Sequence, residues 1–566
     1  MRQIPIFLFL FIATSVAYAQ SGITTQRSQE LIDKAREMRQ RIETRRKQVA
    51  PVEEKKENPP KSEAAEGKAF IKVIQVTGAR VIAESAIRGV TSAYENKELT
   101  LADMQTVADK ITDLYRQAGY VTSTAVLPPQ KIKDGILAIN VVEGKTGDVE
   151  VRNNLFFSRK LILKQVKLKK GEAFNINELR AYLVRVNEHP DISVKSVLAP
   201  GKEPGTSDVV LDVKDSLPLH AEFVYDDYGS RSLRKNRYST LLTDNNLTGQ
   251  GDILTLQYQI SDAEDYRLLS GRYLLPINDR VKLGFFAARS RLALGREFRE
   301  VMARGKSDTY SVYTVIDLIN KDQLTVAANL GFDYKNSINM QMTDVESKDM
   351  LRVPRLGLDI DASDDLWGGG RTIISPEIDL GVPGIMGGMK AKDPIASRAG
   401  SGGKYVKETL NAYRLQNLPW NINLLWKNSA QASPDILTAS EQFQLGGISN
   451  MRGYPSAYKV GDQGLTTTFE FTFPLYGLDP NIKVPFCSDS LAKALKLALF
   501  YDWGYATLHH PQSGEHKQNT LADYGVGTRF DLSTGLSLSM DVAWPVVQVE
   551  GEDHSPITWF RASQKF

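Results

Sequence analysis

Short segments in which apolar and polar residues alternate recur between residues 217 and 566, and they limit the possible folds more than any other feature. Every second residue is apolar in segments 254–260, 422–426 and 536–544. A period of two gives a β-strand one apolar face and one polar face. Turn residues separate the segments, so this part of the chain is predicted to form many short antiparallel strands. A soluble β-sandwich and a membrane barrel would both produce this pattern.

The amino terminus has the pattern of a secretory signal peptide. A basic residue precedes an apolar run over residues 4–16, and Ala17-Tyr18-Ala19 is a small-x-small cleavage site. A membrane anchor needs about twenty apolar residues, and this run is shorter. We therefore expect residues 1–19 to be removed, so that the mature chain begins near Gln20.

No later apolar run is long enough for a membrane-spanning helix, so insertion into a membrane would require a closed barrel. The signal peptide, the terminal Phe566 and aromatic residues at strand ends, such as Tyr258 and Trp544, favour an outer-membrane barrel over a sandwich. At roughly ten residues per strand plus connections, residues 217–566 are predicted to form fourteen to eighteen strands.

Residues 20–50 are predicted to contain an amphipathic helix, and residues 51–68 a flexible linker. The helix would be surrounded by basic residues. It would be a solvated helix, a membrane-surface helix or a helix resting in a polar channel. The linker is rich in Pro, Glu, Lys and Ala without periodicity. The apolar stripe of the helix consists of Leu31, Ile32, Ala35, Met38 and Ile42.

Two similar units follow, over residues 69–144 and 145–216. Each has the order strand, helix, helix, strand, strand, and this repetition indicates a tandem duplication of a small α+β domain. In the first unit, Thr100 and Asp103 have the spacing of a capping box at the start of a helix.

A stretch at 445–464 connects two segments with strand patterning, at 442–445 and 465–473. About twenty residues is long for a connection without a purpose. It contains Met451, Arg452, Gly453 and Tyr454, which include a planar cation, a residue free to adopt positive φ and an aromatic ring. On these residues alone, a solvated surface loop is the simplest interpretation.

The segment that begins at Leu495 offers a partner for Arg452. Leu499 and Tyr501 share one face of the predicted strand, and Phe500 and Asp502 share the other. If the leucines meet lipid, Asp502 faces the lumen, where an inward-folded loop would bring Arg452 to it. An exposed pair is worth at most ~1 kcal/mol, whereas removing one partner of an enclosed pair costs roughly 3 to 5 kcal/mol.

These residues carry a family resemblance. Met451-Arg452-Gly453-Tyr454 resembles the arginine-glycine-aromatic motif in the sixth extracellular loop of the Omp85 superfamily, although the family usually has an aliphatic residue in place of Met451. Phe500-Tyr501-Asp502-Trp503-Gly504 resembles its partner motif on the barrel wall, where Phe500, Asp502 and Gly504 are the site residues. Residues 127–130 and 225–229 resemble the first POTRA domain and the first barrel strand of two-partner secretion transporters.

The resemblance implies a transmembrane β-barrel of about sixteen antiparallel strands in the bacterial outer membrane. Two small α+β POTRA domains in the periplasm and an N-terminal plug helix would precede it, and the helix and the long loop would occupy the lumen. Its function would be two-partner, or type V, secretion of one large unfolded adhesin or haemolysin. Since no ATP-binding motif is present, folding of the exported protein outside the cell would supply the direction.

Other function classes fit the sequence less well. A barrel-assembly factor of the same superfamily would share Arg452 and Asp502, and a passive porin would need no periplasmic domains. The sequence has no Gly-x-Ser-x-Gly or His-Glu-x-x-His motif, so no enzyme activity, catalytic residue, cofactor or metal is expected. The net charge of +3 indicates no nucleic-acid partner. The expected partners are the exported protein and outer-membrane lipid, and the transporter is expected to act as a monomer.

Overall fold

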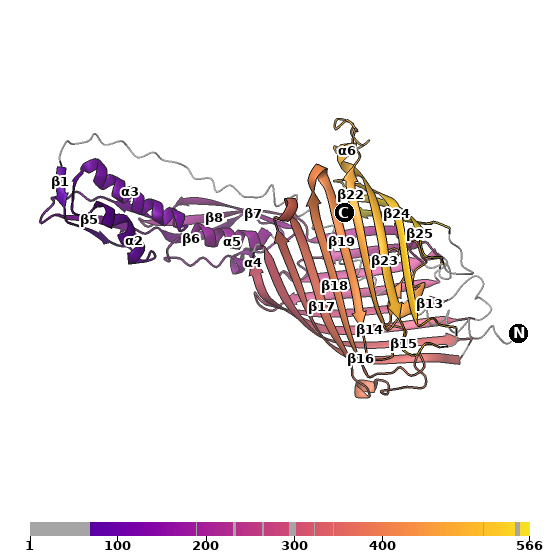
Figure 1. Cartoon of the computed structure of the whole chain (residues 1–566). Coiled ribbons are helices and arrows are strands. Elements are labelled where there is room, and N and C mark those ends of the chain that lie inside the picture. Colours follow the sequence, from indigo (N-terminus) through magenta and orange to yellow (C-terminus); the bar gives the residue numbers. More distant parts are fainter. Residues whose placement is uncertain are drawn as a thin grey trace. The chain divides into compact units, whose positions relative to one another are not determined.

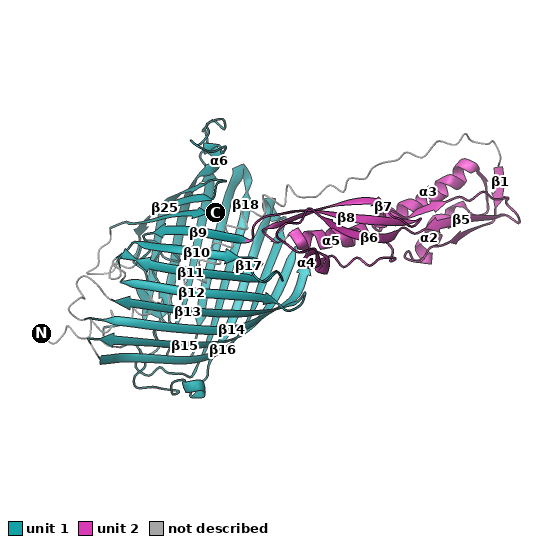
Figure 2. Ribbon diagram, turned by 180° about the vertical axis from the view of Figure 1, so that it is seen from behind, with its two compact units in different colours: residues 1–45, 219–566 teal, residues 46–218 magenta. Residues whose placement is uncertain are grey.

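The computed structural model describes residues 68–566 apart from 188, 230–233, 263–264, 294–301, 322, 343, 513 and 549–554. The predicted signal peptide, the predicted plug helix and all but the last residue of the predicted linker lie outside the described residues. The described chain belongs to two compact units, 68–218 and 219–566, which are coloured separately in Figure 2.

Residues 68–218 contain two three-stranded sheets of the same topology (Figure 1). The strand orders are β2-β5-β4 and β6-β8-β7, and in each sheet the central strand is parallel to the first strand and antiparallel to the last. The repeated order of elements in the sequence predicts this identity. The strands are β1 (Lys68–Ile71), β2 (Val73–Thr77), β3 (Lys97–Thr100), β4 (Thr124–Val126), β5 (Ile136–Val142), β6 (Lys145–Arg152), β7 (Ile192–Pro200) and β8 (Thr206–Asp215).

Helices cover these sheets, and each sheet has its own apolar core. Thr100 and Asp103 form the predicted capping box at the start of α3, with the Thr100 N–H donating to Asp103 Oδ2 over 2.9 Å. Tyr115 is fully buried near the end of α3, whereas the neighbouring Leu114 is only partly buried. The position of α2 was not predicted from the sequence. The helices are α2 (Glu84–Thr91), η1 (Ser92–Tyr94), α3 (Leu101–Gln117), α4 (Arg159–Gln165) and α5 (Ile176–Asn187).

Residues 219–566 form a closed antiparallel barrel of sixteen strands within the described chain, and β26 pairs with β9 to close it (Figure 1). The predicted strand count is thus confirmed. The barrel strands are β9 (Leu219–Asp226), β10 (Arg237–Asp244), β11 (Ile253–Ser261), β12 (Tyr266–Pro276), β13 (Val281–Ala293), β14 (Arg304–Lys321), β15 (Leu324–Gln341), β16 (Asp344–Asp364), β17 (Gly370–Gly381), β18 (Tyr405–Leu418), β19 (Ile422–Ala432), β22 (Gln463–Pro474), β23 (Leu495–Thr507), β24 (Gln518–Asp531), β25 (Leu536–Pro545) and β26 (Ile557–Lys565). Short helices η5 (Leu366–Gly368), η6 (Ile385–Gly387), η7 (Pro419–Asn421) and α6 (Leu491–Ala494) lie between strands.

The prediction that residues 442–445 form a barrel strand is wrong. Phe443–Leu445 is strand β20, which pairs only with β21 (Lys459–Gly461) in a separate two-stranded sheet. The barrel strand that precedes the long connection is β19, so the connection runs from 433 to 462 rather than from 445 to 464. Phe443 and Leu445 alternate with polar residues because they pack in an apolar cluster of their own, not because they face lipid.

Alternating burial along the barrel strands separates an outer face from a lumenal face. On β23, Leu499 and Tyr501 are exposed, whereas Phe500 and Asp502 are buried. This is the parity that the sequence predicts. No helix among the described residues is long and apolar enough to cross a membrane.

Candidate functional site in the barrel lumen

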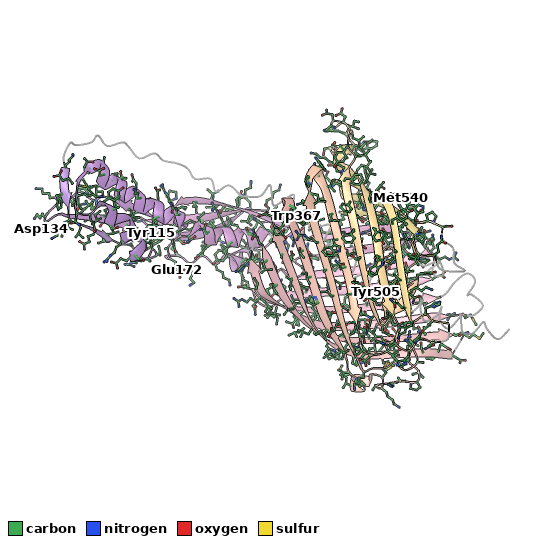
Figure 3. The ribbon with its side chains drawn as sticks, in the orientation of Figure 1. Tyr115, Asp134, Glu172, Trp367, Tyr505 and Met540 are labelled. Carbon is green, nitrogen blue, oxygen red and sulfur yellow. The ribbon has the colours of Figure 1, made fainter. Side chains whose placement is uncertain are left out.

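The connection between β19 and β22 packs against the inner face of the barrel wall. Its hairpin, β20 and β21, contributes to a buried apolar cluster that also includes residues of β23 and β24. Because these two strands belong to the wall, the cluster fixes the connection to it. Figure 3 labels Tyr505 on β23 and Met540 on β25, the two strands that flank β24. The cluster consists of Phe443, Leu445, Met451, Tyr454, Ala506 and Leu521, with Tyr458 partly buried beside it.

Arg452 lies at the centre of the contact between the loop and the wall. Its Nε donates to Asp502 Oδ2 over 2.8 Å and its Nη2 donates to Asp502 Oδ1 over 3.1 Å, which is a bidentate pair. Its guanidinium carbon lies 3.3 Å from the ring centroid of Phe500. Arg452 is 4% exposed and Asp502 is 0% exposed. The pair is therefore enclosed, which is the case in which loss of one partner is costly.

Further charges surround this pair. Arg452 Nη1 donates to Glu470 Oε2 on β22 over 2.8 Å, and Arg529 on β24 bonds both Glu470 and Asp541. Burial lowers the pKa of Arg452, but the neighbouring carboxylates of Asp502 and Glu470 outweigh burial and raise the pKa well above its usual value. Arg452 is therefore a permanent cation that links the loop to two wall strands.

The backbone around Arg452 is also held. The Arg452 carbonyl accepts a 2.7 Å hydrogen bond from Trp559 Nε1 on β26. The Tyr454 hydroxyl lies 2.9 Å from the Ala522 carbonyl and accepts from the Val547 N–H over 3.1 Å. Tyr454 thus contacts the wall at β24 and stacks on Tyr458, whereas the ring against the Arg452 guanidinium is Phe500.

Gly453 has a different role from the predicted one. The sequence suggested a glycine needed for positive φ, but Gly453 has no positive φ. Instead, a Cβ at this position would lie 2.6 Å from the Asp523 Cβ and 3.1 Å from the Pro545 N. Gly504 similarly leaves room on β23, since a Cβ there would lie 3.1 Å from Leu445 of the hairpin. Both glycines allow the loop and the wall to approach closely.

Gly453→Ala is expected to push the loop away from β24, because the added methyl has no space. Overpacking of this kind costs about 1–3 kcal/mol. The variant should show a larger ionic conductance in planar bilayers and reduced secretion. Gly89→Ala is the matched control, because a Cβ at Gly89 on α2 meets nothing within 4 Å. Equal conductance of Gly453→Ala and the unmodified chain would contradict the close-approach explanation.

A second anchor was not predicted from the sequence. Glu441, which precedes the hairpin, accepts a 2.9 Å hydrogen bond from Lys335 Nζ on β15 and forms an ion pair with Lys407 on β18. Burial raises the pKa of Glu441, but the two ammonium groups outweigh burial and lower the pKa to about 2. Alternation along β15 and β18 places both lysines on the inner face of the barrel, and the sequence could have indicated this. It could not have identified Glu441 as their partner.

The two anchors lie on separated parts of the wall. From β23, which carries Asp502, the order around the sheet is β22, β19, β18, β17, β16 and β15. Lys335 is therefore six strands from Asp502 in a barrel of sixteen. The connection is attached to both regions through Arg452 and Glu441.

The described residues offer no group of three or more His, Cys, Asp or Glu side chains that could hold a metal ion. The site consists of ion pairs, aromatic contacts and backbone hydrogen bonds. Such contacts hold the connection in one conformation against the barrel wall.

Comparison with known proteins identifies the family. Residues 205–530 match the family described as haemolysin secretion/activation protein ShlB/FhaC/HecB, and residues 70–144 match the POTRA domain of ShlB type. The chain belongs to this secretion family. It is therefore a two-partner secretion transporter of the outer membrane with POTRA domains in the periplasm, rather than a barrel-assembly factor or a porin.

Two curated relatives are transporters that the chain matches over more than three quarters of their length. It is 23% identical over 473 residues to the heme/hemopexin transporter protein HuxB of Haemophilus influenzae, covering 80% of this chain and 79% of HuxB. It is 24% identical over 569 residues to the outer membrane transporter CdiB of Escherichia coli, covering 94% of this chain and 88% of CdiB.

Solved structures share its fold. CdiB from Escherichia coli superimposes with a TM-score of 0.70 at 21% identity, covering 97% of this chain and 98% of CdiB. BamA from Haemophilus ducreyi, in a form that lacks POTRA domains 1–3, gives a TM-score of 0.54 at 14% identity, covering 88% of this chain and 99% of that truncated chain.

Proposed function

We propose that this transporter is a gated pore that receives one unfolded partner protein in the periplasm and releases it at the cell surface. The enclosed pair between Arg452 and Asp502 carries the proposal, because it fixes the 433–462 connection inside a closed barrel. We name this connection the lid. Passage of a polypeptide requires the lid to leave the lumen or to move against the wall, and the ion pairs set the free energy of that movement.

We further propose a division of the chain into functional parts. Residues 1–19 are the signal peptide, 20–50 the plug helix, 51–68 the linker, 69–144 and 145–216 the two POTRA domains, and 217–566 the barrel. The stripe with Leu31 and Ile42 gives the plug helix one apolar face, and its basic residues suit a polar channel. The linker lets the helix leave the lumen without unfolding the POTRA domains.

The POTRA sheets support recognition by strand addition. In the order β2-β5-β4 the outer strands have a partner on one side, and the same holds for β6 and β7 in the second sheet. An extended segment can add to such an edge through main-chain hydrogen bonds, which require little sequence information. Recognition of this kind suits a substrate that arrives unfolded.

The exported partner is a single large protein of the adhesin or haemolysin type. HuxB is named as a transporter for heme and hemopexin, and CdiB as an outer membrane transporter. Since the sequence contains no ATP-binding motif, folding of the partner outside the cell supplies the direction of transport. One chain contains all the proposed parts, and its barrel closes on itself, so the working unit is a monomer.

Deletion of both POTRA domains, residues 69–216, tests recognition by these domains. The deleted chain is expected to insert as a barrel, to conduct ions and to lose secretion of the partner protein. Heat-dependent mobility in gel electrophoresis reports whether the barrel has folded. Full secretion by the deleted chain would defeat the proposal.

A further inference from the structure

The second POTRA unit carries an exposed apolar tip at Leu155 and Phe156. Leu155 is 81% exposed and Phe156 is 46% exposed. The next residue, Phe157, is buried and packs edge-to-face on His189 with a ring-centroid distance of 4.8 Å. The chain therefore anchors one phenyl ring in the core and presents the two preceding apolar side chains to solvent.

The tip is held in this conformation by hydrogen bonds. The carboxylate of Asp215 accepts from the N–H groups of Leu155, Phe156 and Phe157 over 3.0, 2.8 and 2.9 Å. Asn154 Nδ2 also donates to the Phe157 carbonyl over 2.8 Å. Exposure of the two apolar side chains is therefore a built feature of the fold and not the result of a frayed loop.

Basic residues surround the tip. Residues 152–170 contain seven lysines and arginines and no aspartate or glutamate. Glu150, Glu172 and Asp148, outside this stretch, pair with three of them. Lys160 and Lys164 are exposed and lie one turn apart on α4, where like charges repel each other. An anionic partner would relieve that repulsion. The seven are Arg152, Arg159, Lys160, Lys164, Lys167, Lys169 and Lys170.

Chain connectivity limits how far the tip can be from the membrane. Asp215 is the last residue of β8 and Leu219 is the first residue of β9. Four residues span at most about 14 Å when fully extended. Since Asp215 is hydrogen-bonded to the tip, the tip is tethered to the start of the first barrel strand, whatever the orientation of the domain.

From these observations, we propose that Leu155 and Phe156, together with Lys160 and Lys164, bind the phospholipid surface of the periplasmic leaflet. The apolar side chains would enter the headgroup region and the ammonium groups would contact phosphates. A lipid surface fits better than an exported polypeptide, because it supplies apolar and anionic groups together. It also lies close to the first barrel strand, to which the tip is tethered through Asp215. The inference depends on the outer-membrane location and not on the proposed secretion mechanism.

A spin label at position 155 tests the inference in the full chain. Leu155→Cys is made in a Cys487→Ser background, because Cys487 is the sole cysteine. The labelled transporter is compared in detergent, in phosphatidylcholine nanodiscs and in nanodiscs that also contain phosphatidylglycerol. Collision with oxygen should increase relative to collision with a water-soluble nickel chelate in the bilayers, most strongly with phosphatidylglycerol. Each cation near an anionic surface contributes about a fivefold bias, so Lys160→Gln with Lys164→Gln should reduce the bound-to-free ratio by about 25-fold.

Two controls make the result decisive. A label at Val184, 38% exposed on α5, should stay accessible to the nickel chelate, and a label at Phe156 should repeat the result for position 155. A label at 155 that remains water-accessible in both bilayers would overturn the inference. Protection by an added unfolded polypeptide in detergent, without protection by lipid, would also overturn it and would assign the tip to the substrate.

Discussion

Arg452→Ala is expected to abolish most secretion while leaving the barrel folded, because a lid without this anchor opens more easily but no longer returns to one defined position in the lumen. The substitution removes the cation that bonds Asp502 and Glu470, and it leaves Asp502 without its bidentate partner, while Arg529 still bonds Glu470 and Asp541. Breaking a buried pair in this way costs roughly 3 to 5 kcal/mol, which is enough to change the population of the lid by a hundredfold or more. Secretion assays and conductance in planar bilayers measure the two consequences, and conductance should rise.

Two further variants separate the role of the ion pair from a general loss of folding. Lys459→Ala removes a cation from the same connection, where Lys459 contacts the Tyr458 ring, and it should retain most secretion. The exchange Arg452→Asp with Asp502→Arg should restore secretion only in part, since the new aspartate would lie beside Glu470. Normal secretion by Arg452→Ala, or equal loss in Lys459→Ala, would count against the lid.

The sequence was informative wherever lipid and lumen make opposite demands on alternate residues. Leu499 and Asp502 lie on opposite faces of β23 for that reason, and their parity was readable without a structure. The same logic failed for Phe443 and Leu445, because a hairpin packed into an apolar cluster produces the same alternation. A period of two indicates a strand with one buried face, but it does not say what covers that face.

The candidate site could be predicted from the sequence only in part, for a similar reason. The sequence suggested Arg452 and Asp502 as partners, although they lie 50 positions apart. Glu441 and Lys335 are 106 positions apart and carry no motif, so their meeting depends on the register of β15 and on the path of the lid. Gly453 was singled out for a conformational reason, whereas its contact with β24 decides its role.

Glu441→Gln is expected to release the other end of the lid and to increase the conductance of the pore. The substitution removes the carboxylate that Lys335 and Lys407 share, although Asp333 and Asp379 remain 3.9 Å and 3.0 Å from them. Because these partners compensate in part, the cost should lie near the lower end of the roughly 3 to 5 kcal/mol for a broken buried pair. Secretion should fall less than in Arg452→Ala, since the contact with Asp502 persists.

A double-mutant cycle decides whether Glu441 acts through its lysines. If the pair transmits the effect, Lys407→Met combined with Glu441→Gln should change conductance by less than the sum of the single changes, because the second substitution removes a contact that is already broken. Glu408→Gln, next to Lys407 and on the exposed face of β18, should have no effect. Strict additivity would show that Glu441 and Lys407 act independently, and unchanged conductance in Glu441→Gln would leave Arg452 as the anchor that holds the lid. If the expected coupling is found, ion pairs at both Arg452 and Glu441 hold the lid in the lumen. Opening then requires that both break.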